Sequence, residues 1–223
     1  MRSLPRAKPK GRMGGYLWLY GFPFSDIEIM AKLQHNSTDI EKWLRLIRAD
    51  SVGATTFAKL IKHFGSADRA LGASVSELAK IDGVGFKTAE QIAATCGKFD
   101  VTAELELAQR LEVWIINIED KRYPPVLKQI YDPPPVLYIK GNLSREDNLA
   151  ISIVGSRRCS LYGQEQSSRL AHFLSSAGFT ICSGMARGID TAAHQGALSA
   201  GGRTIAVQGC GLANTKMVVP III

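Results

Sequence analysis

Residues 150–158 read AISIVGSRR, and residues 179–190 read FTICSGMARGID. Each stretch opens with a near-continuous apolar segment, which is typical of a parallel strand buried on both faces of a sheet. A helical pattern over 160–177 joins them. A further helix over 191–200 leads to a third apolar segment at 204–207. Strand, helix, strand, helix and strand at these lengths predict a Rossmann-like, doubly wound α/β sheet, of which this chain carries a part.

Both glycine-containing loops follow the carboxyl ends of predicted parallel strands, where ligands bind in open α/β sheets. Each loop combines glycines, hydroxyl groups and arginine ahead of a helix, and such groups together can hold a phosphate. A single loop of this kind is better explained by tight turns and solvated arginines. Two such loops on the same edge of the sheet instead favour binding of a ligand. The sequence has no GxGxxG motif after the first strand, which disfavours a nicotinamide cofactor, and no GxxxxGK[ST] motif, which disfavours a P-loop ATPase. We therefore expect no cofactor.

The segment 37–111 is predicted to be a small all-helical domain. Apolar residues recur at helical spacing, and Ser74 and Glu77 form a capping-box pattern. Within it, Gly83-Val84-Gly85 resembles the tight turn of a helix-hairpin-helix, and Ser51-Val52-Gly53 repeats the pattern without the first glycine. Such hairpins contact DNA in some proteins and only mediate packing or protein contacts in others. The sequence leaves both interpretations open.

A stiff connector is predicted between the helical domain and the first parallel strand. Short strands over 114–117 and 136–139 flank proline-rich breakers and a helical turn over 126–130. With the α/β segment this gives a second domain over 112–223. Residues 1–36 fall outside both domains and are expected to be a basic, disordered extension.

The charge distribution favours a polyanionic partner. The net charge of +7 divides into +5 over residues 1–12, −2 over 13–147 and +4 over 148–223. No apolar run is long enough to span a membrane, and the four cysteines show no CxxC pair, so we expect a cytoplasmic protein with reduced thiols and no metal site.

No residue pattern predicts catalysis. Asp190 and His194 lie four residues apart and could meet on one helix face. Asp190 is also a natural helix N-cap, and capping with surface packing is the favoured explanation of this pair.

Several long motifs in this order resemble the DNA-processing protein A (DprA/Smf) family. The connector strings DKRYPPVL at 120–127 and IYDPPPVLY at 130–138 are similar to the family's connector. IVGSR at 153–157, SGMARGIDTAAH at 183–194 and GCGL at 209–212 resemble its Rossmann signatures. The helical segment resembles its N-terminal sterile-alpha-motif or helix-hairpin-helix module.

The resemblance implies a protein without catalytic activity that binds and protects single-stranded DNA. Such proteins load the RecA recombinase onto DNA during natural transformation and recombination in competent cells, and they act as homodimers or through dimer contacts. The candidate DNA contacts carried over from the family motifs are Gly155, Ser156, Arg157, Ser183, Gly184, Arg187 and Gly188.

The segment ANTKMVVPIII at 213–223 departs from the family pattern, so we expect a truncated or frameshifted member, and a homodimer is in doubt. Two alternatives to the DNA-binding function are kept. One is a nucleotide phosphoribohydrolase-like enzyme of the lysine-decarboxylase-like Rossmann type, although its Gly-Gly-rich loop and glutamate signature are missing. The other is a nonfunctional gene fragment.

Overall fold

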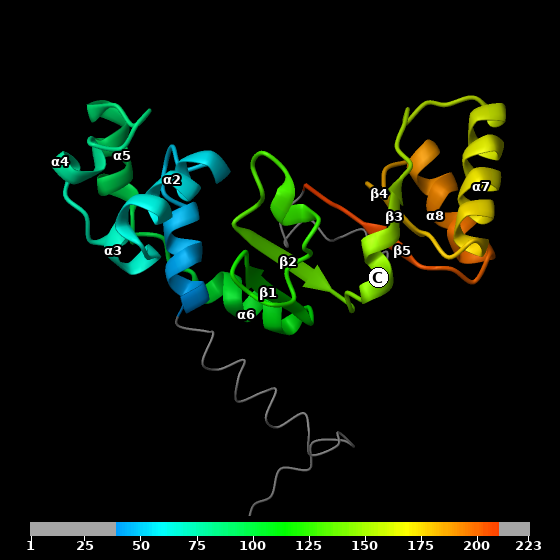
Figure 1. The fold of residues 1–223 in the computed structure, drawn as a ribbon, viewed down its shortest axis with the longest axis horizontal. Helices are drawn as coiled ribbons and strands as arrows, with labels where there is room; N and C mark the ends of the chain where they lie inside the picture. The colour runs from blue at the N-terminus through cyan, green and yellow to red at the C-terminus, as the bar shows by residue number, and fades with distance from the viewer. Residues whose placement is uncertain (1–38, 210–223) are drawn as a thin grey trace, which may run out of the picture. The chain divides into compact units, whose positions relative to one another are not determined.

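The computed structural model describes residues 39–209, which form a helical domain, a connector and a parallel α/β unit (Figure 1). The expected basic extension over 1–36 and the segment from Cys210 onward lie outside the described residues. Within the described range, an N-terminal helix-hairpin-helix domain is followed by an α/β region with a parallel sheet, as predicted.

The helical domain begins with a helix over residues 39–47. The helices that follow are α2 (Ala54–Phe64), α3 (Ala67–Leu71), α4 (Val75–Leu78), α5 (Phe86–Thr95) and α6 (Thr102–Arg110). The predicted capping box is present, because Ser74 and Glu77 each accept a hydrogen bond from the other's backbone N–H. The five-residue helix α3 was not predicted.

Two turns of this domain have the same construction. Ser51 has a φ of 65° and Gly83 a φ of 78°, so both occupy the left-handed region that favours glycine. The valine that follows each of them is buried. Gly53 and Gly85 then form the extended N-caps of α2 and α5. The domain therefore contains two helix-hairpin-helix units, and Ser51 takes the place of the missing first glycine.

The core of the helical domain is large and mostly aliphatic. Trp43 and Phe57 pack with ring centroids 4.8 Å apart, and Leu46, Leu60 and Ile92 are fully buried around them. Ile118 and Val136 of the connector also pack against this core. The same hydrophobic cluster thus holds the connector to the helical domain.

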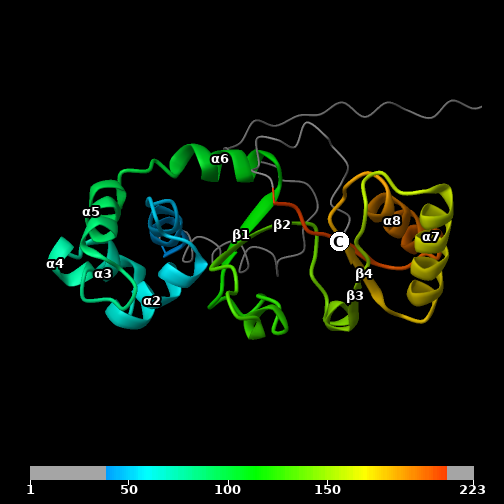
Figure 2. The same ribbon diagram turned by 90° about the horizontal axis from the view of Figure 1, so that it is seen from above.

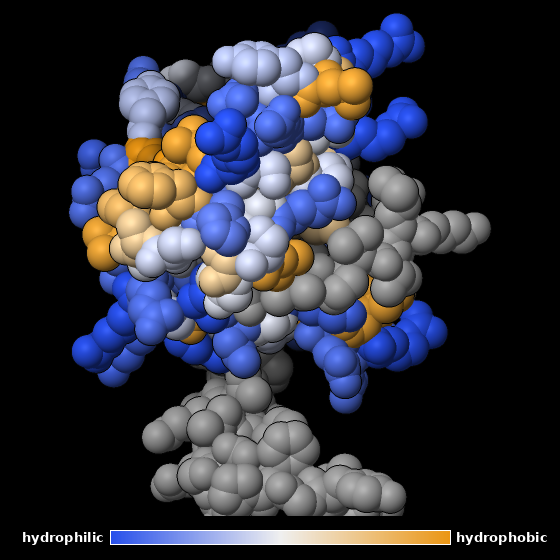
Figure 3. All heavy atoms as spheres, turned by 90° about the vertical axis from the view of Figure 1, so that its right-hand side faces the viewer, coloured by the Kyte–Doolittle hydropathy of each residue, from blue (hydrophilic) through white to orange (hydrophobic). Residues whose placement is uncertain are grey.

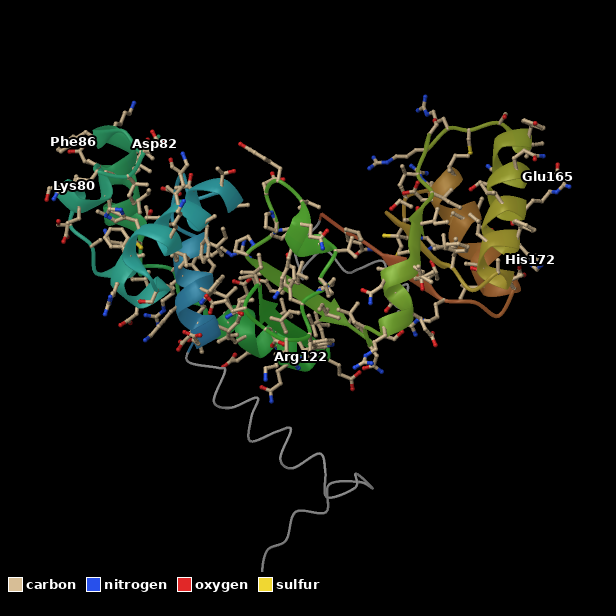
Figure 4. The ribbon with its side chains drawn as sticks, viewed as in Figure 1. Lys80, Asp82, Phe86, Arg122, Glu165 and His172 are labelled. Carbon is tan, nitrogen blue, oxygen red and sulfur yellow. The ribbon has the colours of Figure 1, made fainter. Side chains whose placement is uncertain are left out.

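The connector contains the antiparallel strands β1 (Val113–Asn117) and β2 (Val136–Lys140), with a 3-10 helix over Leu127–Gln129 between them in the sequence. Tyr123 is buried in a cluster with Ile116 of β1 and Ile139 of β2, and it donates its hydroxyl hydrogen to the carbonyl of Pro134 at 2.8 Å. Arg122 also belongs to the connector (Figure 4). Its guanidinium lies 4.9 Å from the ring centre of Trp114. These contacts explain why a proline-rich segment forms a defined structure.

The parallel sheet has the order β3 (Ala150–Ser152), β4 (Thr180–Ser183) and β5 (Thr204–Ala206). Helices α7 (Leu161–Ser176) and α8 (Ile189–Ser199) join successive strands. The two helices lie side by side, and both cover the same face of the sheet (Figures 1 and 2). Right-handed crossovers that progress in one direction along a sheet place their helices on one face.

The prediction that the first parallel strand is buried on both faces was wrong for the described residues. Ala150 and Ser152 of β3 are exposed, whereas Ile181 in the central strand β4 is fully buried. The difference follows from position, since β3 is an edge strand and the residues described provide helices for one face only. Figure 3 shows apolar surface areas among hydrophilic ones on the side of the molecule that carries α7, where Leu170 and Phe173 are exposed.

An ion pair ties the end of the connector to the sheet. Asp147, in the 3-10 helix Arg145–Leu149, accepts hydrogen bonds from Nε and Nη2 of Arg203, both at 3.0 Å, and from the hydroxyl of Thr180 at 3.1 Å. Burial acts to raise the pKa of Asp147, but these hydrogen bonds outweigh it and hold the pKa below its usual value.

Candidate functional site

The two predicted loops meet at the carboxyl-terminal edge of the sheet. The first loop, residues 153–160, joins β3 to α7, and the second loop, residues 184–188, joins β4 to α8. The N–H of Ile189 donates to the carbonyl of Ser156 at 3.3 Å and so connects the two segments directly. The structure thus brings all seven candidate residues to the same edge.

Asp190 holds both loops with one carboxylate. Its Oδ1 accepts from the N–H of Gly155 at 3.3 Å, and its Oδ2 accepts from the N–H groups of Gly184 at 3.2 Å and Ala186 at 3.4 Å. Asp190 is 6% exposed. The expected N-cap role is wrong, because Gly188 is the N-cap of α8 and Asp190 is the second residue of that helix. Burial of its carboxylate is offset by these three donors.

Glycines are required here for close approach between the loops. Gly188 has a φ of 87° and a ψ of −125°, and a Cβ on it would lie 2.3 Å from the carbonyl oxygen of Ser156. A Cβ on Gly155 would lie 2.7 Å from a side-chain carbon of Ile189. The family motifs predict these glycines as DNA contacts, whereas their surroundings first of all explain how the two loops pack together.

Met185 provides a strained backbone position in the second loop. Its φ of 55° lies in the left-handed region, which is uncommon for a residue that is not glycine. This conformation turns the neighbouring N–H groups of Gly184 and Ala186 toward the same oxygen of Asp190. Strained conformations of this kind concentrate at functional sites.

The hydroxyl groups of the loops have structural partners. Ser183 is buried and donates to the carbonyl of Ile153 at 2.7 Å, and the hydroxyl of Ser156 accepts from the N–H of Arg158 at 3.1 Å. Ser160 caps α7 by accepting from the N–H of Gly163. Ser183 therefore positions the sheet edge, and its side chain does not face solvent.

The groups left available for a ligand are cationic side chains and backbone N–H donors. Arg157, Arg158 and Arg187 are exposed and form no ion pair with any residue in 39–209. The N–H groups of Ser156 and Arg157 likewise donate no hydrogen bond within the described residues. Guanidinium groups beside free N–H groups are suited to phosphate oxygens.

His194 does not form a catalytic pair with Asp190. Its Nδ1 lies 2.6 Å from the hydroxyl of Thr204, which donates to the carbonyl of Ile181, so Nδ1 carries the hydrogen. Its Nε2 is buried and has no hydrogen-bond partner. Burial lowers the pKa of His194, and the nearby charge of Asp190 opposes this shift. His194 therefore packs α8 against the sheet as a neutral group.

A second groove of the described chain lies away from the two loops. It measures about 430 Å³, is lined by Thr180, Gly202 and Arg203 among others, and lies at the opposite edge of the sheet, where β4 begins. Because Arg203 is engaged there by Asp147, this groove offers no free cation. Among residues 39–209, no three potential ligands are grouped to hold a metal ion, and no helix is long and apolar enough to cross a membrane.

The chain combines a helical domain that contains two helix-hairpin-helix units with a Rossmann-like α/β region whose loop edge carries exposed arginines. Two family models match the chain. The DprA-like N-terminal HHH domain covers residues 38–105, and the DNA recombination-mediator protein A family covers residues 114–218. The chain belongs to the DprA/Smf family, which confirms the resemblance drawn from the sequence.

Individual relatives agree with this assignment. The chain is 34% identical to Protein Smf of Synechocystis sp. over 174 residues, which are 76% of this chain and 44% of the relative. It is 46% identical to DNA processing protein DprA of Streptococcus pneumoniae over 96 residues, which are 43% of this chain and 34% of that protein. The chain thus spans less than half the length of these curated relatives.

A solved structure is similar as well. The X-ray structure of DNA processing protein A from Streptococcus pneumoniae superposes with a TM-score of 0.62 at 29% sequence identity. The superposition covers 78% of this chain and 59% of that one. It supports the order of a helical domain followed by a parallel α/β unit.

Proposed function

We propose that this chain binds single-stranded DNA at the edge formed by the first and second loops and takes part in DNA recombination without catalysis. One observation carries the proposal. Asp190 fixes two loops against each other, and the fixed loops present Arg157, Arg158 and Arg187 to solvent. A preorganised row of cations and N–H donors recognises a phosphate backbone and carries no information about base sequence.

The chemistry of the loops supports binding over hydrolysis. Asp190 is the carboxylate within the two loops and the start of α8, and its oxygens already accept three N–H groups. A general acid or base needs a carboxyl group that can reach a substrate proton. The phosphoribohydrolase-like alternative therefore has no candidate residue here, and nucleoside-monophosphate turnover by the purified chain would support it.

Family membership extends the proposal to partners. Membership of a family of DNA recombination mediators supports the further proposals that the chain loads RecA onto DNA, forms a homodimer and is located in the cytoplasm. Co-precipitation of RecA with the chain, in the presence and absence of oligo-dT, tests the partner directly.

The test of DNA binding uses fluorescence anisotropy with labelled oligo-dT and a duplex of equal length. We expect the single strand to be preferred and its association constant to fall steeply with salt. Arg157→Ala should weaken binding by about 1–3 kcal/mol, the range for a charged hydrogen bond. Arg169→Ala, an exposed arginine in the middle of α7, is the matched control and should leave affinity unchanged. Preference for duplex, or equal effects of the two variants, would refute the proposal.

A further inference from the structure

A second surface with groups suited to nucleic acid lies on the helical domain. Helix α2 and the connector enclose a groove of about 240 Å³. We call it the α2 groove. Its lining includes Thr55, Ala58, Lys59 and Lys62 from the helix and Tyr131 and Pro133 from the connector.

The α2 groove has a defined geometry on both sides. Positions 55, 58, 59 and 62 are spaced by three and four residues and so lie on one face of α2. The connector side is held by Val136, which packs against the helical core, and by Tyr138, which donates its hydroxyl hydrogen to Glu104 of α6 at 2.7 Å. The two walls are therefore fixed by contacts outside the groove.

Tyr131 is an aromatic ring that the fold leaves in solvent. It is 94% exposed, and its neighbour Ile130 is 45% exposed. Val126, on the other side of the 3-10 turn, is 58% exposed. Exposed apolar residues grouped in one short segment mark an interaction surface more often than scattered ones do.

The charge of the groove is positive by one unit. Lys62 is exposed and forms no ion pair within residues 39–209. Lys59 donates to the carbonyl of Asp82 at 2.8 Å and forms an ion pair with the carboxylate of Asp82 at 3.5 Å, so Lys62 is the lysine of the lining that remains available for a phosphate. Asp132 is the acidic residue of the lining, and it opposes an anion on the connector side.

We infer that the α2 groove is a second binding site for single-stranded DNA, in which a base stacks on Tyr131 and Lys62 contacts a neighbouring phosphate. An exposed aromatic ring beside lysines is the combination that holds unpaired bases without sequence preference. The groove is smaller than the roughly 300–1,000 Å³ of small-molecule pockets, so it suits one flat group. The inference rests on the proposed function, because it adds a second site for the same ligand, single-stranded DNA.

The test combines cross-linking with paired substitutions. An oligo-dT with 5-iododeoxyuridine in place of single thymidines is irradiated with the whole chain, and tryptic peptides are analysed by mass spectrometry. We expect a cross-link in the peptide 129–140, which contains Tyr131. Tyr131→Ala should weaken binding of oligo-dT roughly five- to 100-fold, as expected for loss of one stacked base.

Controls separate charge, stacking and fold. Lys62→Ala should lower the slope of log association constant against log salt by about 0.7, the value for one contact to single-stranded phosphate. Phe173→Ala removes another exposed ring, which lies on α7 and is 69% exposed, and should leave affinity unchanged. Thermal unfolding should be the same for wild type and all three variants, since each side chain is exposed.

The outcomes distinguish this site from the loop site. If Tyr131→Ala weakens binding and Arg157→Ala does not, the α2 groove stands and the proposed loop site falls. If Tyr131→Ala and Phe173→Ala bind as tightly as wild type and no cross-link forms in 129–140, the inference is overturned. A groove that instead binds a protein partner would give this second result.

Discussion

The carboxylate of Asp190 accepts a hydrogen bond from the N–H of Gly155, a residue 35 positions earlier in the chain, at 3.3 Å. The same carboxylate binds two N–H groups of the second loop. One buried side chain thus determines the spacing of the two loops that carry the exposed arginines.

Asp190→Asn should destabilise the chain and weaken its binding of oligo-dT. The amide keeps the size of the carboxylate but lacks its charge and turns an NH₂ group toward N–H donors. We expect a loss of about 1–3 kcal/mol in the free energy of unfolding, the cost of impaired hydrogen bonding in a buried site. Urea denaturation measures this loss.

Glu165→Gln, on the exposed face of α7 (Figure 4), is the control and should change stability by less than about 0.5 kcal/mol. Equal stability of Asp190→Asn and wild type would contradict the role of Asp190.

Gly188→Ala should be more destabilising than a change at another glycine with positive φ. Its Cβ would lie 2.3 Å from the carbonyl oxygen of Ser156, which is a backbone atom and cannot rotate away as a flexible side chain can. We expect at least about 3 kcal/mol from strain and displacement together. Gly201→Ala in the same α/β unit has a φ of 66° and open space around it, so it isolates the backbone strain of about 1 kcal/mol. Similar losses for the two variants, again by urea denaturation, would show that the loops do not pack as closely as described.

The stability of the α/β unit should fall as the pH decreases below about 6.5. The pKa of His194 is lowered in the folded state by burial, so the unfolded chain binds a proton first. The contribution of neutral His194 to the free energy of unfolding is therefore present above the pKa of the unfolded chain. It is lost as the pH falls through the pKa of the folded chain. His194→Gln should flatten this part of the stability profile measured by urea denaturation between pH 8 and about 5. His172→Gln, exposed on α7, should keep the profile of the wild type. If both variants keep it, His194 does not cause the dependence.

Gly83→Ala should destabilise the second hairpin by about 1–2 kcal/mol. The residue has a φ of 78°, and a Cβ there would lie 2.9 Å from Nζ of Lys59, which would have to leave the carbonyl of Asp82. Gly53, the N-cap of α2 in the first hairpin, has an ordinary φ of −94° and free space around it. Gly53→Ala should therefore lower the free energy of unfolding by only a few tenths of a kcal/mol to about 1 kcal/mol. Thermal unfolding of the two variants compares them. A larger loss for Gly53→Ala would contradict the left-handed turn described at Gly83.

Local sequence patterns predicted the elements that depend on nearby residues. The Ser74–Glu77 capping box, the Gly83-Val84-Gly85 turn and the parallel strand after Gly178 are all specified within a few positions of the chain. The turn at Ser51 could be predicted as well, because its valine and second glycine match the second hairpin. The sequence could not show that Ser51 adopts a φ of 65°, and this feature was seen only in the structure.

Features that depend on distant residues could not be predicted in this way. Asp190 looks like a helix cap in the sequence, and only the fold brings Gly155 to its other oxygen. Helix α3 has five residues, too few to show a periodic pattern, and depends on the cap that Ser66 provides to Arg69. The exposure of β3 likewise depends on which neighbours a strand has and not on its own apolar residues.

Titration of the ¹⁵N-labelled chain with oligo-dT, followed by amide chemical shifts, tests the central claim most directly. The account predicts the largest changes at Ser156, Arg157 and Arg187, because the first two N–H groups are unpaired within the described residues and the guanidinium groups beside them are free. Gly202 and Arg203, at the opposite edge of the sheet, should shift little. Saturable binding that leaves the amides of both loops unchanged would contradict the account.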